Sequence, residues 1–200
     1  MKSLVFTVAT LLSLSTAYAQ TWGVDKAHSG VAFTVTHNLL SEVDGKFKTF
    51  DAKITSAKPD LSDAVFELTA DVNSISTENE RRDGHLKSPD FFDAAKYPTV
   101  TFKSTSFKKV EGKKYKLMGD LTMHGVTKPV ALDVTMNGPV AMKGMGGKEQ
   151  EKTGFKASGT LKRSDFGIGT IPVVVVSDEI ELKVTGEFTK QDASATAEKK

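Results

Sequence analysis

The sequence predicts an all-β protein: an eight-stranded antiparallel barrel with one short inserted helix. Apolar residues alternate with polar residues in eight separate stretches, as they do in strands with one buried face. Turn-forming residues separate several of these stretches, which favours antiparallel pairing of successive strands. Only one segment has a helical pattern. Eight such strands leave exposed edges unless the sheet closes on itself, and a barrel removes those edges.

The strands are identified by apolar residues that recur at every second position. Val31, Phe33 and Val35 show this pattern in the first stretch, and successive side chains of a strand point to opposite faces. The stretch 43–55 is weaker, with Phe47 as one of its few large apolar members. The predicted strands are 30–37, 43–55, 63–73, 98–107, 114–123, 127–137, 152–163 and 177–189.

The inserted helix is predicted between the third and fourth strands. Thr77 and Glu80 form a capping-box pattern, with Thr77 as the N-cap residue and Glu80 bonding back to it. Pro89 ends the helix, because the residue before a proline disfavours helical backbone angles. We expect this helix to lie across one mouth of the barrel.

The composition fits one domain that needs no metal or disulfide to fold. The chain has 200 residues and no cysteine, and a domain of this size buries roughly 70% of its unfolded surface. Lys and Arg number 27 and Asp and Glu number 25, which gives a formal net charge of +2. The sequence therefore lacks the basic footprint of a nucleic-acid-binding protein, and we expect no nucleic acid among its partners.

The N-terminus has the pattern of a secretory signal peptide. Lys2 precedes the apolar stretch Leu4–Thr16, and Ala17–Ala19 has the small-x-small form of a cleavage site. The alternative, a membrane anchor, is disfavoured because a transmembrane helix needs roughly 20 apolar residues. In a Gram-negative source, cleavage after Ala19 would place the protein in the periplasm. The predicted organisation is a cleaved signal peptide over 1–19, a barrel over 20–190 and a disordered tail over 191–200.

The inward faces of the predicted strands combine large apolar residues with small ones. Ala70, Ala157 and Gly159 leave volume near the barrel axis, although a strand glycine also marks a bend or close packing. An eight-stranded barrel either fills its interior with side chains or holds one small ligand. A cavity with this lining suits a hydrocarbon, because burial is worth about 0.8 kcal/mol per CH₂ group. The predicted lining residues are Phe33, Phe66, Leu68, Phe102, Leu121, Leu132, Phe155, Gly159, Leu161, Leu182 and Phe188.

The sequence carries no catalytic or metal-binding motif, so we expect neither enzymatic activity nor a cofactor. The lack of cysteine excludes a thiol nucleophile and a thiolate metal site. The four histidines, His28, His37, His85 and His124, show no zinc-binding spacing. Ser164 lacks the GxSxG context of a nucleophile elbow.

A polar cluster on the predicted helix admits two interpretations. Arg81 and His85 lie four residues apart and share a helix face, and Arg82 adds a second guanidinium. The cluster is either a solvated helix face or an anion clamp at the barrel mouth, where arginine would bind a phosphate or carboxylate head group. Phe91 and Phe92 follow and are either a core plug or a ligand gate.

The run Ile171–Val176 is continuously apolar. It is either the buried start of the last strand or an exposed rim that contacts a membrane or a partner. We favour burial.

Five stretches of the sequence stand out together by their order and spacing: Asp25–Ser29 with Val31–His37, Asn79–Leu86 with Ser88–Asp93, Tyr97–Phe102, Gly119–Val130 and Arg163–Gly167. With these motifs the chain resembles the YceI-like family, also called lipid/polyisoprenoid-binding. The resemblance runs from about Trp22 to Lys190.

This resemblance implies a lipocalin-like barrel with an inserted helix and a tunnel for a long isoprenoid or similar amphiphile. It further implies frequent dimerisation and a periplasmic location, which agrees with the predicted signal peptide. The family pattern also implies that Arg82, His85 and the segment Phe91–Asp93 frame the pocket, unless that motif serves to hold the helix onto the barrel.

Three functional hypotheses follow. The first is a carrier that sequesters a long-chain isoprenoid or fatty lipid, with transient membrane contact and homodimerisation. The second is an enzyme that acts on a lipid, and the third is a structural or stress-response interaction protein with a filled barrel. A continuous apolar tunnel would favour the first, a converging carboxylate, histidine and hydroxyl the second, and a tightly packed interior the third.

Overall fold

The computed structural model describes residues 19–144 and 146–192. The predicted signal peptide, apart from Ala19, and all but the first two residues of the predicted tail therefore lie outside the described residues. The strands are β1 (Gln20–His37), β2 (Ser41–Phe47), β3 (Phe50–Ser56), β4 (Val65–Asp71), β5 (Ile75–Ser76), β6 (Thr99–Glu111), β7 (Lys114–Met123), β8 (Val126–Lys143), β9 (Glu149–Lys162) and β10 (Val176–Lys190). One α-helix, α1 (Glu80–Lys87), and two 3₁₀ turns, η1 (Val72–Ser74) and η2 (Arg163–Phe166), complete the fold.

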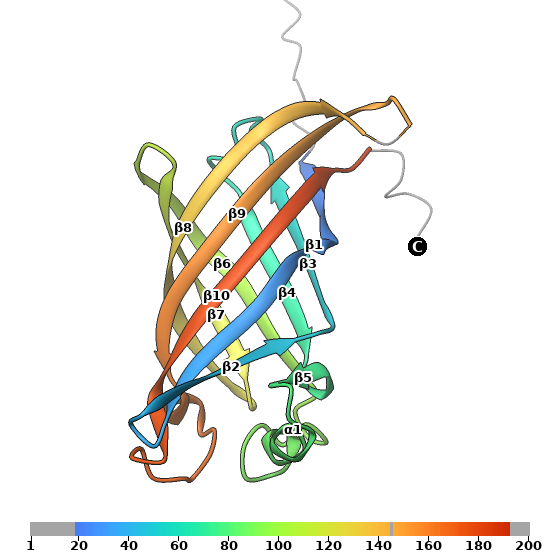
Figure 1. The fold of residues 1–200 in the computed structure, drawn as a ribbon. Coiled ribbons are helices and arrows are strands. Elements are labelled where there is room, and N and C mark those ends of the chain that lie inside the picture. The colour runs from blue at the N-terminus through green and yellow to red at the C-terminus, as the bar shows by residue number, and fades with distance from the viewer. Residues whose placement is uncertain (1–18, 145, 193–200) are drawn as a thin grey trace, which may run out of the picture.

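The sheet closes into an antiparallel barrel, as predicted (Figure 1). Its strand order is β10-β9-β8-β7-β6-β4-β3-β1-β2-β5, and β1 also pairs with β10. Because β2 and β3 pair with different halves of β1, they occupy one position in the wall, and the barrel has eight positions. The two-residue β5 adds to the outer edge of β2. No helix in the described part of the chain is long and apolar enough to span a membrane.

The predicted strand 43–55 is two strands, and the physical reason lies outside it. The backbone N–H of Lys48 donates to the carbonyl of Ser74 at 3.1 Å, and that of Thr49 donates to the Ser74 hydroxyl at 2.9 Å. The corner between β2 and β3 is thus bonded to η1 and not to β1. The first strand also begins at Gln20, ten residues earlier than predicted, because its N-terminal part pairs with β3 and β10.

Helix α1 begins two residues later than predicted. Asn79, not Thr77, is the N-cap residue: its side-chain oxygen accepts from the Arg82 N–H at 3.0 Å. Thr77 is buried instead, and its N–H and hydroxyl both donate to Asp83, at 2.7 and 2.6 Å. Helix α1 lies across one end of the barrel (Figure 1), and none of its eight residues is buried.

Both ends of the barrel are filled by buried side chains. At the end away from α1, which we term the aromatic end, the rings of Phe107 and Tyr115 stack with centroids 4.4 Å apart, and Trp22 is fully buried. At the α1 end, Phe91, Phe92 and their neighbours form a second cluster. Phe102 and Leu182 pack against both clusters, so the two clusters meet in the middle of the barrel.

Candidate ligand-binding cavity

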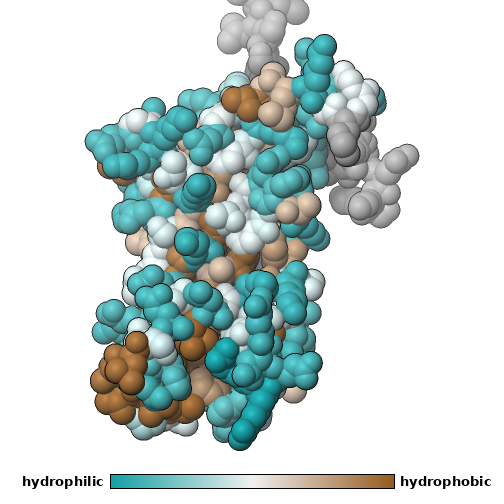
Figure 2. All heavy atoms as spheres, viewed as in Figure 1, coloured by the Kyte–Doolittle hydropathy of each residue, from teal (hydrophilic) through white to brown (hydrophobic). Residues whose placement is uncertain are grey.

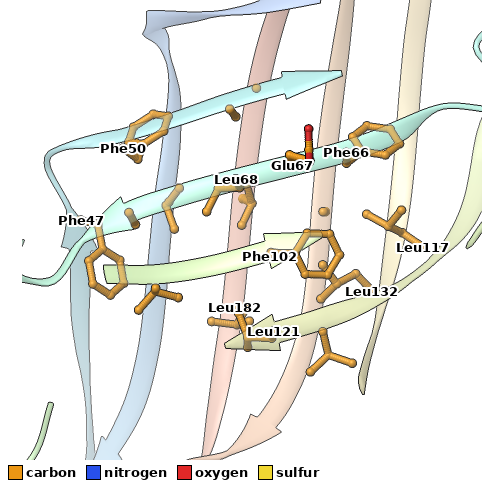
Figure 3. Close-up of a pocket in the computed structure, with 18 of the residues that line it drawn as sticks. Phe47, Phe50, Phe66, Glu67, Leu68, Phe102, Leu117, Leu121, Leu132 and Leu182 are labelled. Carbon is orange, nitrogen blue, oxygen red and sulfur yellow. The ribbon is translucent and has the colours of Figure 1, made fainter. Parts of the chain in front are cut away.

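An apolar cavity lies where the two clusters meet. It extends from Phe47 and Phe92 near the α1 end to Phe155 and Phe188 near the aromatic end. It encloses about 150 Å³ in which the centre of a water-sized sphere can move. Figure 3 shows side chains from several strands pointing into this space, Phe102 among them. A cavity this long and this small is narrow, which suits a single flexible chain better than a bulky ring system.

Most residues predicted to line a tunnel do line this cavity. They are Phe33, Phe66, Leu68, Phe102, Leu121, Leu132, Phe155, Leu161, Leu182 and Phe188. The prediction missed Phe47 and Phe50, which also line it. Their stretch showed weak alternation because the corner between β2 and β3 interrupts it, so the sequence offered only their large apolar side chains as a signal.

Gly159 does not line the cavity, and its predicted role is wrong. A Cβ atom at Gly159 would lie 2.7 Å from Leu132 Cδ2 and 3.0 Å from the carbonyl oxygen of Ala131. The glycine therefore permits close packing of Leu132 over β9, and the space that it leaves is filled by that side chain. The small residues that do border the cavity are Ala52, Ala70, Ala157 and Gly186.

Of the residues predicted at the head group or mouth, the structure brings only Phe92 to the cavity. Arg82 is committed elsewhere: its Nε donates to the Thr77 hydroxyl at 2.7 Å, which fixes α1 to the chain that precedes it. Arg81 is exposed, and His85 pairs with Asp90 at 3.2 Å on the surface. Phe91 is buried beside the ring of His85 and outside the cavity lining.

Three polar residues join the apolar lining, and two of them form an ion pair. Lys53 Nζ lies 2.8 Å from Glu67 Oε2, and Lys103 Nζ lies 3.1 Å from Glu67 Oε1. The hydrogen bonds from the two lysines lower the pKa of the Glu67 carboxyl, and the bond from Lys53 has the larger effect. The third polar lining residue is Thr185. None of the three was among the residues predicted from the sequence, because strand alternation places them outward.

Within residues 19–144 and 146–192, one cluster of possible metal ligands lies outside the cavity, on β1 and β10. Ligand atoms of Asp25, His28 and Glu187 lie within 4.8 Å of one another. However, Lys152 Nζ lies 2.6 Å from Glu187 Oε1, and His28 Nδ1 lies 2.9 Å from Asp25 Oδ2. Because a lysine already neutralises one carboxylate and the imidazole engages the other, we interpret the group as an ion-pair network.

A buried arginine organises the loop that precedes β10. Arg163 is 4% exposed, and its guanidinium donates to the carbonyl oxygens of five residues: Ile168, Gly169, Ile171, Val176 and Ser177. Five backbone acceptors are satisfied by one side chain, so the loop is held against the α1 end of the barrel. Sequence reasoning missed this role, although Arg163 opens one of the family-like motifs.

The same loop carries exposed aliphatic side chains, so the favoured burial of Ile171–Val176 is wrong for its centre. Val173 and Val174 are 56% and 57% exposed, because Arg163 binds the backbone of the loop and leaves its tip outside. Leu39 and Leu40, at the turn between β1 and β2, are 69% and 89% exposed. The Asn38 N–H donates to the Val175 carbonyl at 2.9 Å, which joins the two tips. Figure 2 shows apolar surface at this end of the molecule.

The closed barrel, its apolar core cavity and its inserted helix define the architecture of a small barrel binding protein. The chain belongs to the YceI-like family: the family model for the YceI-like domain matches residues 22–188. A curated relative, Protein YceI of Salmonella newport, is 38% identical over 189 residues, which cover 93% of this chain and 96% of that protein.

Solved structures show the same fold. BcnA of Burkholderia cenocepacia superposes with a TM-score of 0.71 at 27% identity, covering 82% of this chain and 98% of that one. The YceI protein of Campylobacter jejuni gives a TM-score of 0.66 at 34% identity, covering 76% of this chain and 88% of that one. A polyisoprenoid-binding domain from Saccharophagus degradans, at 14% identity and a TM-score of 0.62, covers 85% and 98% and shares the fold.

Proposed function

We propose that this protein is a periplasmic carrier that sequesters the tail of a long-chain isoprenoid or similar amphiphilic lipid in its barrel cavity. The observation that carries the proposal is the narrow cavity, whose lining is apolar except for three residues. Each CH₂ group transferred from water into such a lining gains about 0.8 kcal/mol before the costs of immobilisation. The proposal assigns the protein no catalytic residue.

Two further observations support parts of this proposal. The N-terminal pattern of Lys2, Leu4–Thr16 and Ala17–Ala19 supports export. The Saccharophagus degradans neighbour, described as a polyisoprenoid-binding domain, supports the ligand class through its fold. Homodimerisation remains a prediction from the family resemblance.

Transient contact with a lipid bilayer belongs to the same proposal. Leu39, Leu40, Val173 and Val174 form an exposed apolar tip at the α1 end. A carrier must take a poorly soluble lipid from a bilayer and return it, and aliphatic side chains on a loop tip insert readily at the membrane interface.

The first experiment is native mass spectrometry of the protein purified from its own periplasm, with organic extraction of bound material. We expect one polyprenyl or fatty chain per barrel. Protein that is empty and fails to take up added lipid would favour a structural role, for which the filled ends of the barrel are the supporting observation.

A matched pair of variants locates the bound chain. Ala157→Phe adds a ring to the cavity wall, whereas Ala131→Phe adds the same ring to the outer face of β8, where Ala131 is exposed. We expect Ala157→Phe to lower lipid affinity at least about tenfold while Ala131→Phe stays within about twofold. Circular dichroism confirms that both variants fold. Equal affinities in two folded variants would contradict binding in this cavity.

A further inference from the structure

The barrel wall is broken beside the cavity, between β1 and β3. In the ladder between β1 and β3, the last pair is Gly23 with Lys53. The next pair on the same edge of β1 is Val31 with Phe47 of β2. Residues 24–30 of β1 thus have no partner in β2 or β3. On its other edge β1 also leaves register, because Asp25 pairs with Glu187 and the next pair is Gly30 with Thr185. Residues 26–29 are unpaired on both edges, and we term them the β1 bulge.

The cavity reaches the wall on both sides of this bulge. Thr185 and Gly186 of β10 border the cavity on one side, and Lys53 of β3 with Glu67 of β4 borders it on the other. Figure 3 shows the Glu67 carboxylate directed away from the apolar side chains, so its contribution lies at the wall. The part of the lining that Lys53 and Glu67 supply therefore lies at the wall, beside the gap in the ladder between β1 and β3.

The β1 bulge is held differently on its two edges. Toward β10, the Glu187 N–H donates to the Ser29 hydroxyl at 3.0 Å, and Asp25, directly before the bulge, is hydrogen-bonded to His28. Toward β3, one side-chain interaction spans the break among the described residues: Lys26 Nζ to Asp51 Oδ1 at 3.5 Å. Both members of this ion pair are mostly exposed, at 63% and 75%, and such pairs contribute little. The β3 edge is therefore the weak edge.

Both ends of the barrel are filled with buried side chains, whereas the wall beside the cavity lacks ladder pairs over residues 24–30 of β1. We propose that a single-chain amphiphile enters and leaves laterally, between the β1 bulge and β3, and that its head group rests at Lys53 and Glu67. This inference rests on the proposed lipid-binding function and names where that site opens.

The charges at this opening select the head group. Two ammonium groups, those of Lys53 and Lys103, face the single carboxylate of Glu67, which leaves one net positive charge. A head group that accepts hydrogen bonds, such as a carboxylate or a phosphate, is favoured there. The head group therefore lies in the wall at mid-barrel, away from the arginines of α1.

Cross-linking the opening tests the route. The chain has no native cysteine, so Lys26→Cys with Asp51→Cys can be joined by a short reducible bis-thiol reagent. The matched control joins Lys116→Cys to Asp133→Cys, another exposed ion pair between neighbouring strands, at 2.6 Å on β7 and β8. The probe is cis-parinaric acid, a fluorescent fatty acid, with rates measured by stopped flow.

We expect the cross-link at the opening to slow association and dissociation at least about tenfold, with reduction of the linker restoring both rates. The control cross-link should change neither rate by more than about twofold. Unchanged rates in fully cross-linked Lys26→Cys/Asp51→Cys protein would overturn the lateral route and point to one end of the barrel.

The head-group position has its own control. Lys53 and Lys103 both pair with Glu67, but only Lys53 borders the cavity. We expect Lys53→Gln to weaken parinaric acid binding about tenfold more than Lys103→Gln does. Equal losses in the two variants would overturn this placement.

A lipid-independent measurement separates this inference from the proposed function. If the unmodified protein takes up no lipid, the proposed function fails, and amide hydrogen exchange decides the opening. We expect the amides of residues 26–29 to exchange at least about a hundredfold faster than those of 31–35, and the Lys26–Asp51 cross-link to slow them. Equal protection of the two segments would overturn the opening.

Discussion

The two ends of the barrel are closed by different physical means. At the aromatic end, side chains close the barrel: Trp22, Phe107 and Tyr115 are buried, and the two rings of Phe107 and Tyr115 stack. At the α1 end, loops and a helix lie across the opening, and polar side chains hold them. Arg163 binds five carbonyl groups there, and Arg82 binds Thr77.

Because of this difference, the two ends should respond differently to the loss of a single side chain. A packed aromatic cluster loses contacts with every atom that moves, so it resists partial opening. The loop before β10 is held by hydrogen bonds from the Arg163 guanidinium, so it can be released as a unit if that side chain is lost. The exposed apolar tip and α1 both lie at the second end, which is where contact with a membrane is proposed.

The largest expected effect is at the aromatic end. Trp22→Ala removes a fully buried indole and leaves a cavity in a packed cluster. We expect a loss of about 3–5 kcal/mol in the free energy of unfolding, measured by urea denaturation. The control is Leu40→Ala at the exposed tip, which should change stability by no more than about 0.5 kcal/mol. A similar loss in both variants would contradict tight packing around Trp22 at the aromatic end.

A smaller and more local effect is expected at the α1 end. Arg163→Met keeps a long apolar stem but leaves five carbonyl groups without their donor. We expect a loss of about 2–4 kcal/mol, accompanied by faster amide exchange in residues 167–176. Arg81→Met, which alters an exposed arginine on α1, is the matched control. If exchange accelerates equally throughout the barrel, the loop is not a separate unit.

The parts of this molecule that could be predicted are those that follow from local alternation. The inward faces of the strands identified ten lining residues, among them Phe102 and Leu182, because parity along a strand decides which face a side chain occupies. The alternation also predicted eight strands, which matches the eight strand positions in the barrel wall. It could not show that the stretch 43–55 is broken, because the break depends on bonds to Ser74, which lies far along the chain.

The errors in the candidate site have the same origin. Gly159 was assigned to the cavity because glycine is small, but whether its space is empty depends on how Leu132 packs over it. Arg82 was assigned to the mouth because arginine binds anions, but its guanidinium donates hydrogen bonds to Thr77 and does not border the cavity. Lys53 and Glu67 were not assigned at all, since alternation places both side chains on the outer face of the barrel.

The smallest expected effect lies between the two ends, in the β1 bulge, and depends on pH. The hydrogen bond to Asp25 raises the pKa of His28, with Glu187 adding to the shift and Lys152 opposing it. The same hydrogen bond lowers the pKa of Asp25. The contribution of charged His28 to the stability of the fold is full below the ordinary histidine pKa of about 6.5, and it is lost as pH rises through the raised pKa. The contribution of charged Asp25 to stability is present above the ordinary aspartate pKa of about 3.9, and it is lost as pH falls through the lowered pKa.

The pair therefore stabilises the bulge most between about pH 4 and pH 6.5. His28→Gln keeps a hydrogen-bonding side chain but removes the titratable charge. We expect its melting temperature to lie about 1–2 °C below that of the unmodified protein at about pH 5.5, and to match it at about pH 9. His37→Gln, on the same strand and exposed, should show no such dependence. A deficit that grows with pH would reverse the sign of the argument and show that neutral His28, not its cation, holds the bulge.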